Sequence, residues 1–112
     1  MSDRINRELK KIKGGIQTSG NEIAFKFSTL PSVLKIVARN QWVILGGDVL
    51  TQEKMYTYDN WYYKPDLNKP LSENVICSIQ KASTYISDYV CKHGEAYLFL
   101  FVLSDTYVDG KM

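Results

Sequence analysis

The sequence contains no long apolar run and no apolar leader at its start. The longest apolar stretch, residues 96–103, is much shorter than the roughly 18 residues that a membrane helix requires. The first four residues, Met-Ser-Asp-Arg, are polar or charged where a signal peptide needs an apolar segment. We therefore expect a protein that crosses no membrane and stays in the cytoplasm.

Cysteine and histidine are too scarce for a disulfide framework or a zinc site. Cys77 and Cys91 lie in one predicted helix, about 21 Å apart along its axis. A disulfide requires Cα atoms within about 7 Å, so these two cannot pair within one chain. The single His93 and the absence of a Cys-x-x-Cys pair leave no ligand set for zinc. We expect free thiols, no metal and no cofactor.

What is present fits a single domain, residues 1–112. The chain contains 45% hydrophobic and 23% charged residues, which are ordinary proportions for a globular protein. A chain of this length buries enough surface to form one core without covalent crosslinks.

Hydrophobic spacing predicts three helices and three or four strands. Ile5, Leu9, Ile12 and Ile16 form one helical stripe, residues 30–37 a second, and residues 75–89 the longest. Residues 42–50 and 56–63 read as a strand hairpin, and residues 96–103 as a central strand; residues 23–27 are a short strand or an irregular lead-in. This order predicts an α+β fold, with two or three helices packed on one face of a small, mostly antiparallel sheet.

The net charge of +2 conceals an asymmetry between the two parts of the chain. Residues 1–39 contain eight cations and three acids, a balance of +5, whereas residues 40–112 contain six cations and nine acids, a balance of −3. The basic N-terminal helix suggests a nucleic-acid-binding module as one alternative function. A lysine-rich helix is more often a solvated face, and no aromatic residues alternate with these charges as a single-strand groove would need.

Residues 56–63, Tyr-Thr-Tyr-Asp-Asn-Trp-Tyr-Tyr, hold more aromatic side chains than one face of a strand can bury. Alternation places Tyr56, Tyr58, Asn60 and Tyr62 on one face, and Thr57, Asp59, Trp61 and Tyr63 on the other. We expect one set to pack on the helices and the other to meet solvent or a partner, since tyrosine and tryptophan often dominate the binding energy of interfaces.

Gly46 and Gly47 precede Asp48 inside a predicted strand. Adjacent glycines there usually mark a bulge or the close approach of another segment. Asp48 and Asp59 could then lie near each other across the hairpin, which leaves a small hydrolase or nuclease as a further alternative. The signal for catalysis is weak because no nucleophile or phosphate loop accompanies the pair, and His93 lacks an orienting partner.

The segments Trp-Val-Ile-Leu-Gly-Gly-Asp-Val-Leu at residues 42–50 and Asn60-Trp61-Tyr62 within the aromatic strand resemble the signature of immunity protein 40. The resemblance covers roughly residues 22–103. It implies a non-enzymatic cytosolic protein that binds and blocks the C-terminal domain of a bacterial toxin from a polymorphic or contact-dependent inhibition system, with no small-molecule substrate.

From the resemblance and the composition together, we expect the acidic, aromatic hairpin to contact the toxin, which we expect to be a nuclease. The expected partner-binding residues are Asp48, Tyr56, Tyr58, Asp59, Asn60, Trp61, Tyr63 and Asp66, with Gly46 and Gly47 as structural motif residues.

Overall fold

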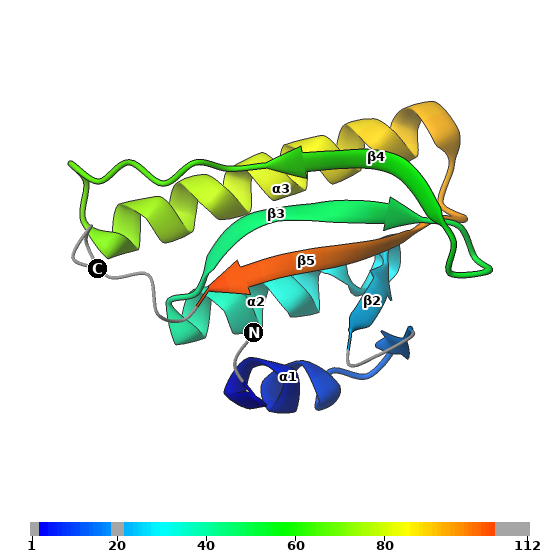
Figure 1. Cartoon of the computed structure of the whole chain (residues 1–112), viewed down its shortest axis with the longest axis horizontal. Helices are drawn as coiled ribbons and strands as arrows, with labels where there is room; N and C mark the ends of the chain where they lie inside the picture. Colours follow the sequence, from blue (N-terminus) through cyan, green and yellow to red (C-terminus); the bar gives the residue numbers. More distant parts are fainter. Residues whose placement is uncertain (1–2, 19–21, 105–112) are drawn as a thin grey trace.

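The computed structural model describes residues 3–18 and 22–104. Its elements, in order, are α1 (Asp3–Lys10), β1 (Ile16–Gln17), β2 (Ile23–Lys26), the 3-10 turn η1 (Phe27–Thr29), α2 (Leu30–Asn40), β3 (Val43–Leu50), β4 (Tyr56–Tyr62), α3 (Leu71–His93) and β5 (Leu98–Ser104). The predicted α+β fold is confirmed (Figure 1).

The five strands form one open sheet in the order β1-β2-β5-β3-β4, and every neighbouring pair is antiparallel. The most apolar strand, β5, occupies the centre, as its composition predicted. The expected number of three or four strands was too low, because β2 is a true strand and the two-residue β1 pairs with it. Since β4 and β5 both run antiparallel to β3, which lies between them, they are parallel to each other.

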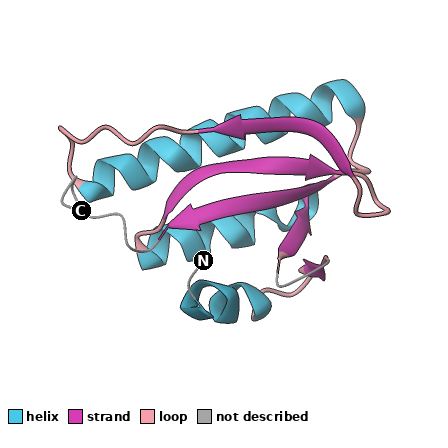
Figure 2. Cartoon of the chain, in the orientation of Figure 1, coloured by secondary structure: helices cyan, strands magenta, loops and turns pink. Residues whose placement is uncertain are grey.

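Helices α2 and α3 cover one face of the sheet (Figure 2), and the main core lies between these layers. The largest fully buried side chain is that of Trp42, which lies between α2 and β3 in the chain. Alternation along β5 directs Phe99, Phe101 and Leu103 into this core, whereas Leu98 and Leu100 belong to a smaller cluster with Leu50 and Ala24.

The first helix is shorter than its apolar stripe suggested. Ile5 and Leu9 are buried and Ile12 packs against the core, but α1 ends at Lys10 and Ile16 lies in β1 instead. Gly14 adopts a φ of 102° in the connecting turn, a conformation that side chains disfavour. In the described part of the chain, no helix has the length and apolar character that a membrane crossing requires.

Candidate functional site

The two halves of the sequence motif form one structural unit. Gly47 lies opposite Trp61 in the register between β3 and β4, and the Trp61 ring passes directly over it. A Cβ atom on Gly47 would collide with that ring and with the Leu100 carbonyl oxygen. The indole also stacks on Tyr85 of α3, with ring centroids 5.0 Å apart, and is only 5% exposed. The expected close approach at the glycines is therefore real.

A bulge interrupts β4 next to this unit. Leu50 pairs with Tyr56 and Asp48 with Asn60, so residues 57–59 stand opposite Val49 alone. The Thr57 hydroxyl donates to the Val49 carbonyl oxygen at 3.0 Å and accepts from the Asp59 amide at 3.1 Å. This side chain thus satisfies backbone groups that the interrupted ladder leaves unpaired.

Tyr58 lies at the centre of the bulge in a strained conformation. Its φ is +72°, in the left-handed region that bulky residues rarely adopt, and its side chain is 88% exposed. Strained residues persist where the surrounding structure over-determines them, and they cluster at functional sites.

Tyr58 belongs to an exposed set that we call the tyrosine surface, consisting of Tyr56, Tyr58, Asn60 and Tyr62. The side chain of Tyr62 is 74% exposed and that of Tyr56 48%. The Tyr56 hydroxyl donates to the Glu22 carboxylate at 3.3 Å, and the Lys81 ammonium lies 5.9 Å from the centre of the Tyr62 ring. Burial, followed by the negative charge of Glu22, raises the pKa of Tyr56. The tyrosine surface is therefore amphipathic, with apolar ring area beside both signs of charge.

Asp48 and Asp59 point to opposite faces of the sheet, so the acidic pair that the hairpin suggested does not form. Asp48 is paired with Asn60, on the face away from Trp61. Asp59 turns toward α3 and accepts a hydrogen bond of 2.8 Å from the Tyr89 hydroxyl. Burial and this hydrogen bond raise the pKa of Tyr89 to about 12. The two carboxylates cannot act on one substrate atom from these positions.

Asp59 borders a recess of about 290 Å³ between β4 and the last turns of α3. Its lining side chains are Asp59, Tyr85, Asp88, Tyr89, Lys92 and His93. The rings of Tyr85 and Tyr89 stack with centroids 6.1 Å apart, and the His93 ring lies 4.4 Å from that of Tyr89. Carboxylates beside aromatic faces can hold a guanidinium or ammonium group supplied by a partner.

Tyr63 and Asp66, both expected at the contact, have structural roles in the free protein. The buried amide of Asn74 accepts from the Tyr63 hydroxyl at 2.6 Å and from the Asp66 amide at 2.8 Å. Its nitrogen donates to the Asp66 carbonyl oxygen at 3.0 Å, so the loop before α3 is fastened to that helix. Sequence reasoning missed Asn74; an asparagine on the apolar face of a predicted helix was the available signal.

Within residues 3–18 and 22–104, no group of three or more His, Cys, Asp or Glu side chains is placed to hold a metal ion. Cys77 and Cys91 are both free, as their spacing in α3 predicted.

Comparison with known proteins assigns the chain to a family. The sequence model of the immunity protein 40 family matches residues 8–103, which is most of the chain. The chain belongs to the immunity protein 40 family. No curated protein and no solved structure matches it significantly. Membership in this family identifies the partner as a protein toxin. In this member, the motif residues Gly47 and Trp61 serve the core, whereas Asp48, Asp59 and Asn60 remain on the surface or at its edge.

Proposed function

We propose that this immunity protein neutralises its toxin by covering it with the tyrosine surface and the adjacent Asp59 recess. The observation that supports this most directly is Tyr58, a large aromatic side chain held almost fully in solvent by a strained, bulged backbone. An exposed ring adds no buried area that would stabilise the free protein, whereas tyrosine is among the residues that contribute most binding energy at interfaces. The arrangement is best explained by a partner that covers it.

Binding is expected to use side chains rather than the addition of a strand. β4 is an edge strand, but its bulge breaks the regular backbone spacing that another strand would need, and Pro65 follows soon after its end. The tyrosine rings would supply contact area, and the Asp59 recess would receive a cationic side chain of the toxin. Asp48 would add negative charge beside Asn60. In the free protein Trp61 supports this surface from below.

We further propose that the toxin is a nuclease. A nuclease toxin would present a basic substrate groove, and Asp48, Asp59 and Asp88 provide carboxylates on or beside the proposed contact region. Long-range attraction would then accelerate encounter before the rings dock. We also propose that the system is of the contact-dependent inhibition type and that the immunity protein acts in the cytoplasm. Both follow from the family resemblance.

The direct test is co-expression with the toxin domain encoded next to this gene, with surviving cells counted. We expect protection by the native protein. Equal killing with and without it would contradict the proposed neutralisation.

The contact surface is tested by Tyr58→Gly and Tyr62→Ala, with thermal unfolding and toxin binding measured on the same samples. Glycine tolerates φ = +72°, so Tyr58→Gly should keep or raise the melting temperature while weakening affinity about thirtyfold, the effect of ~2 kcal/mol at an interface. Ile76→Ala serves as the control, because it shortens an exposed apolar side chain that lies on α3 and not on β4. It should leave the affinity for the toxin unchanged. Normal toxin binding by both folded tyrosine variants would place the interface elsewhere.

A further inference from the structure

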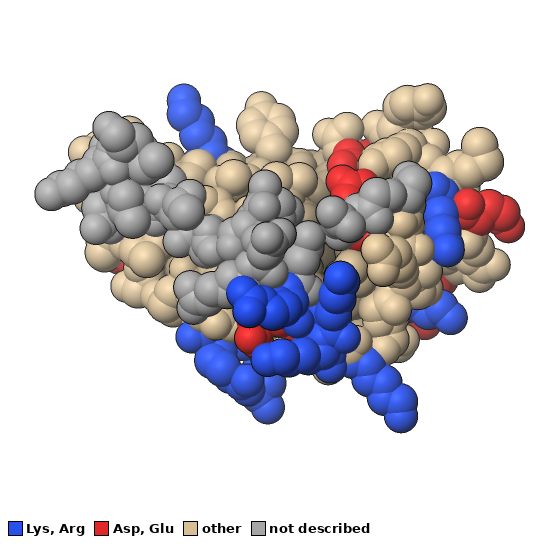
Figure 3. All heavy atoms as spheres, turned by 60° about the horizontal axis from the view of Figure 1, so that its bottom comes forward, with Lys and Arg blue, Asp and Glu red and all other residues tan. Residues whose placement is uncertain are grey.

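A groove on the opposite side of the molecule from β4 concentrates positive charge. It lies between the end of α1 with its following turn and the exposed side of α2, and has a volume of about 500 Å³. The lining side chains are Glu8, Lys11, Ile12, Lys13, Ser32, Lys35, Ile36 and Arg39. Figure 3, which brings the side with α1 forward, shows Lys and Arg gathered over this region with little acidic surface among them.

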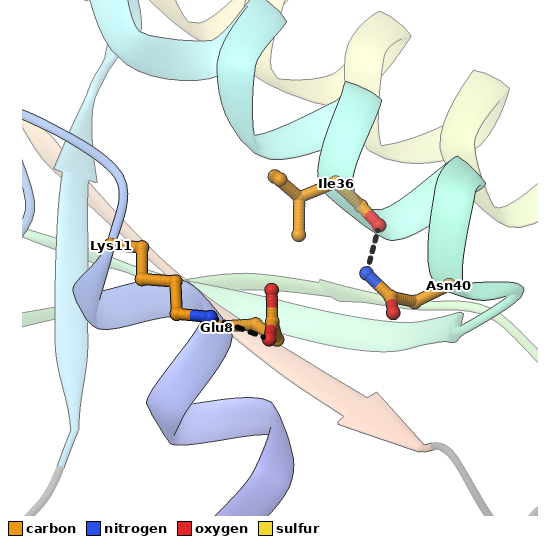
Figure 4. Close-up of polar contacts among 4 residues, drawn as sticks. All are labelled: Glu8, Lys11, Ile36 and Asn40. Atoms are coloured by element: carbon orange, nitrogen blue, oxygen red, sulfur yellow. Dashed lines mark hydrogen bonds and ion pairs between the residues drawn. The ribbon is translucent and has the colours of Figure 1, made fainter.

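Within residues 3–18 and 22–104, most of the positive charge in the groove has no acidic partner. Four cations face a single acid, Glu8, which forms a 3.1 Å ion pair with Lys11 (Figure 4). Among the residues that the structure describes, no ion pair engages Lys13, Lys35 or Arg39. The nearby Asn40 amide is occupied within α2, where it donates to the Ile36 carbonyl oxygen at 2.9 Å. The groove therefore has cationic walls that are free to bind an anionic ligand.

The floor of the groove distinguishes between anionic ligands. Ile12 and Ile36 are partly buried and pack against the core, so they offer apolar surface between the cations. None of the described side chains that line the groove is aromatic, so none of them offers a ring on which a nucleic-acid base could stack. An acidic peptide that also carries an apolar side chain matches both the walls and the floor.

We infer that the groove between α1 and α2 is a second binding site, which accepts an acidic segment of a partner protein. Its carboxylates would bind Lys13, Lys35 and Arg39, and a leucine-like side chain would contact Ile12 and Ile36. This site is independent of the tyrosine surface and does not rest on the proposed mode of toxin binding. Figure 1 shows α1 and β4 on opposite sides of the molecule.

The test uses a labelled peptide of glutamate residues with two leucines as the probe, titrated into the full-length protein at low salt. We expect saturable binding that weakens as salt rises. Changing Lys13, Lys35 and Arg39 together to glutamine should reduce the affinity for the peptide at least about tenfold. Each exposed ion pair contributes only modestly, but three are lost at once. A control that changes the exposed Lys54, Lys64 and Lys69 to glutamine removes the same charge elsewhere and should change affinity less than about twofold.

A peptide in which serine replaces both leucines should bind several-fold more weakly, because it loses the apolar contact with the floor. A single-stranded oligonucleotide and a short duplex of equal charge complete the comparison. Tighter binding of either nucleic acid would overturn the inference in favour of a nucleic-acid site. The inference would also be overturned if the peptide did not bind, or if the groove variant and the control variant lost the same affinity for it. Protection against the toxin, measured with the groove variant, should be unchanged, so the two proposals fail independently.

Discussion

At the scale of single residues, the hairpin divides its side chains between structure and surface. Trp61 and Tyr58 are three positions apart in one strand, yet the first is 5% exposed and the second 88%. The difference arises from the bulge and from Gly47, which leaves room for the indole beneath the sheet. Loss of stability and loss of binding should therefore follow from different substitutions within β4.

Gly47→Ala should lower the free energy of unfolding by about 2 to 3 kcal/mol, because its Cβ would overlap the Trp61 ring and the fixed Leu100 carbonyl oxygen. Urea denaturation measures this change. A Gly47→Ala variant as stable as the native protein would contradict the role of Gly47 as the space for Trp61.

Tyr89 should titrate near pH 12, and Asp59→Asn should move its pKa back toward 10. Burial and the hydrogen bond to Asp59 both favour the neutral phenol in the folded state. The contribution of Tyr89 to stability is therefore fully present below pH 10 and is lost as the pH rises through about 12. The difference in tyrosinate absorbance between the native protein and Tyr89→Phe isolates this group. An unchanged titration after Asp59→Asn would exclude the carboxylate as a cause.

At the scale of elements, two buried polar side chains of α3 bind the adjacent chain segments. The Ser78 hydroxyl accepts from the Ile44 amide at 3.0 Å, beside the register shift in β3, and donates to the Val75 carbonyl oxygen at 2.9 Å. Asn74 fastens the loop that follows β4. A helix with only apolar residues at these positions would leave backbone groups of its neighbours unpaired.

Asn74→Ala should lower the free energy of unfolding by about 2 to 3 kcal/mol, because the Tyr63 hydroxyl and the Asp66 amide would lose their acceptor. Amide hydrogen exchange should accelerate in the loop before α3. In the same loop, Asn68→Ala should change stability by less than about 0.5 kcal/mol, since the side chain of Asn68 is exposed. Native exchange rates in the Asn74 variant would show that the loop is held by other contacts.

At the scale of the whole molecule, charge and aromatic surface lie on different sides. The basic groove is formed by α1 and α2, whereas the tyrosine surface belongs to β4 at the opposite edge of the fold. This separation would allow a protein with a net charge of only +2 to bind the proposed basic toxin at one surface and the proposed acidic segment at another.

Changing Lys10, Lys11 and Lys13 to glutamine should leave toxin affinity within about tenfold of the native value. Exposed charges away from a contact mainly alter the association rate and its salt dependence. Titration of the toxin domain at two salt concentrations provides the measurement. A loss of several orders of magnitude in toxin affinity would show that the N-terminal helix is the principal contact. It would then favour the alternative hypothesis of an acidic or nucleic-acid partner.

The sequence by itself determined the fold class and the order of most elements. Apolar periodicity located the three helices, the hairpin and the central position of β5, because burial imposes a period of 3.6 on helices and of two on strands. The alternation of side chains along residues 56–63 also predicted which residues share each face of β4. The adjacent pair Gly46 and Gly47 predicted the close approach of another segment to the strand that contains them. Two residues were too few to predict β1, and the stripe through Ile16 continued past the true end of α1.

Only the tertiary structure decided which of the motif residues are buried and which are available. The positions of Asp48 and Asp59 on opposite faces, the strained φ of Tyr58 and the fastening of Tyr63 and Asp66 by Asn74 all depend on a bulge and on contacts between segments distant in sequence. The same holds for the groove that brings Lys13 together with Arg39. Local periodicity specifies the face on which a side chain lies, but the packing of several elements determines what that side chain meets.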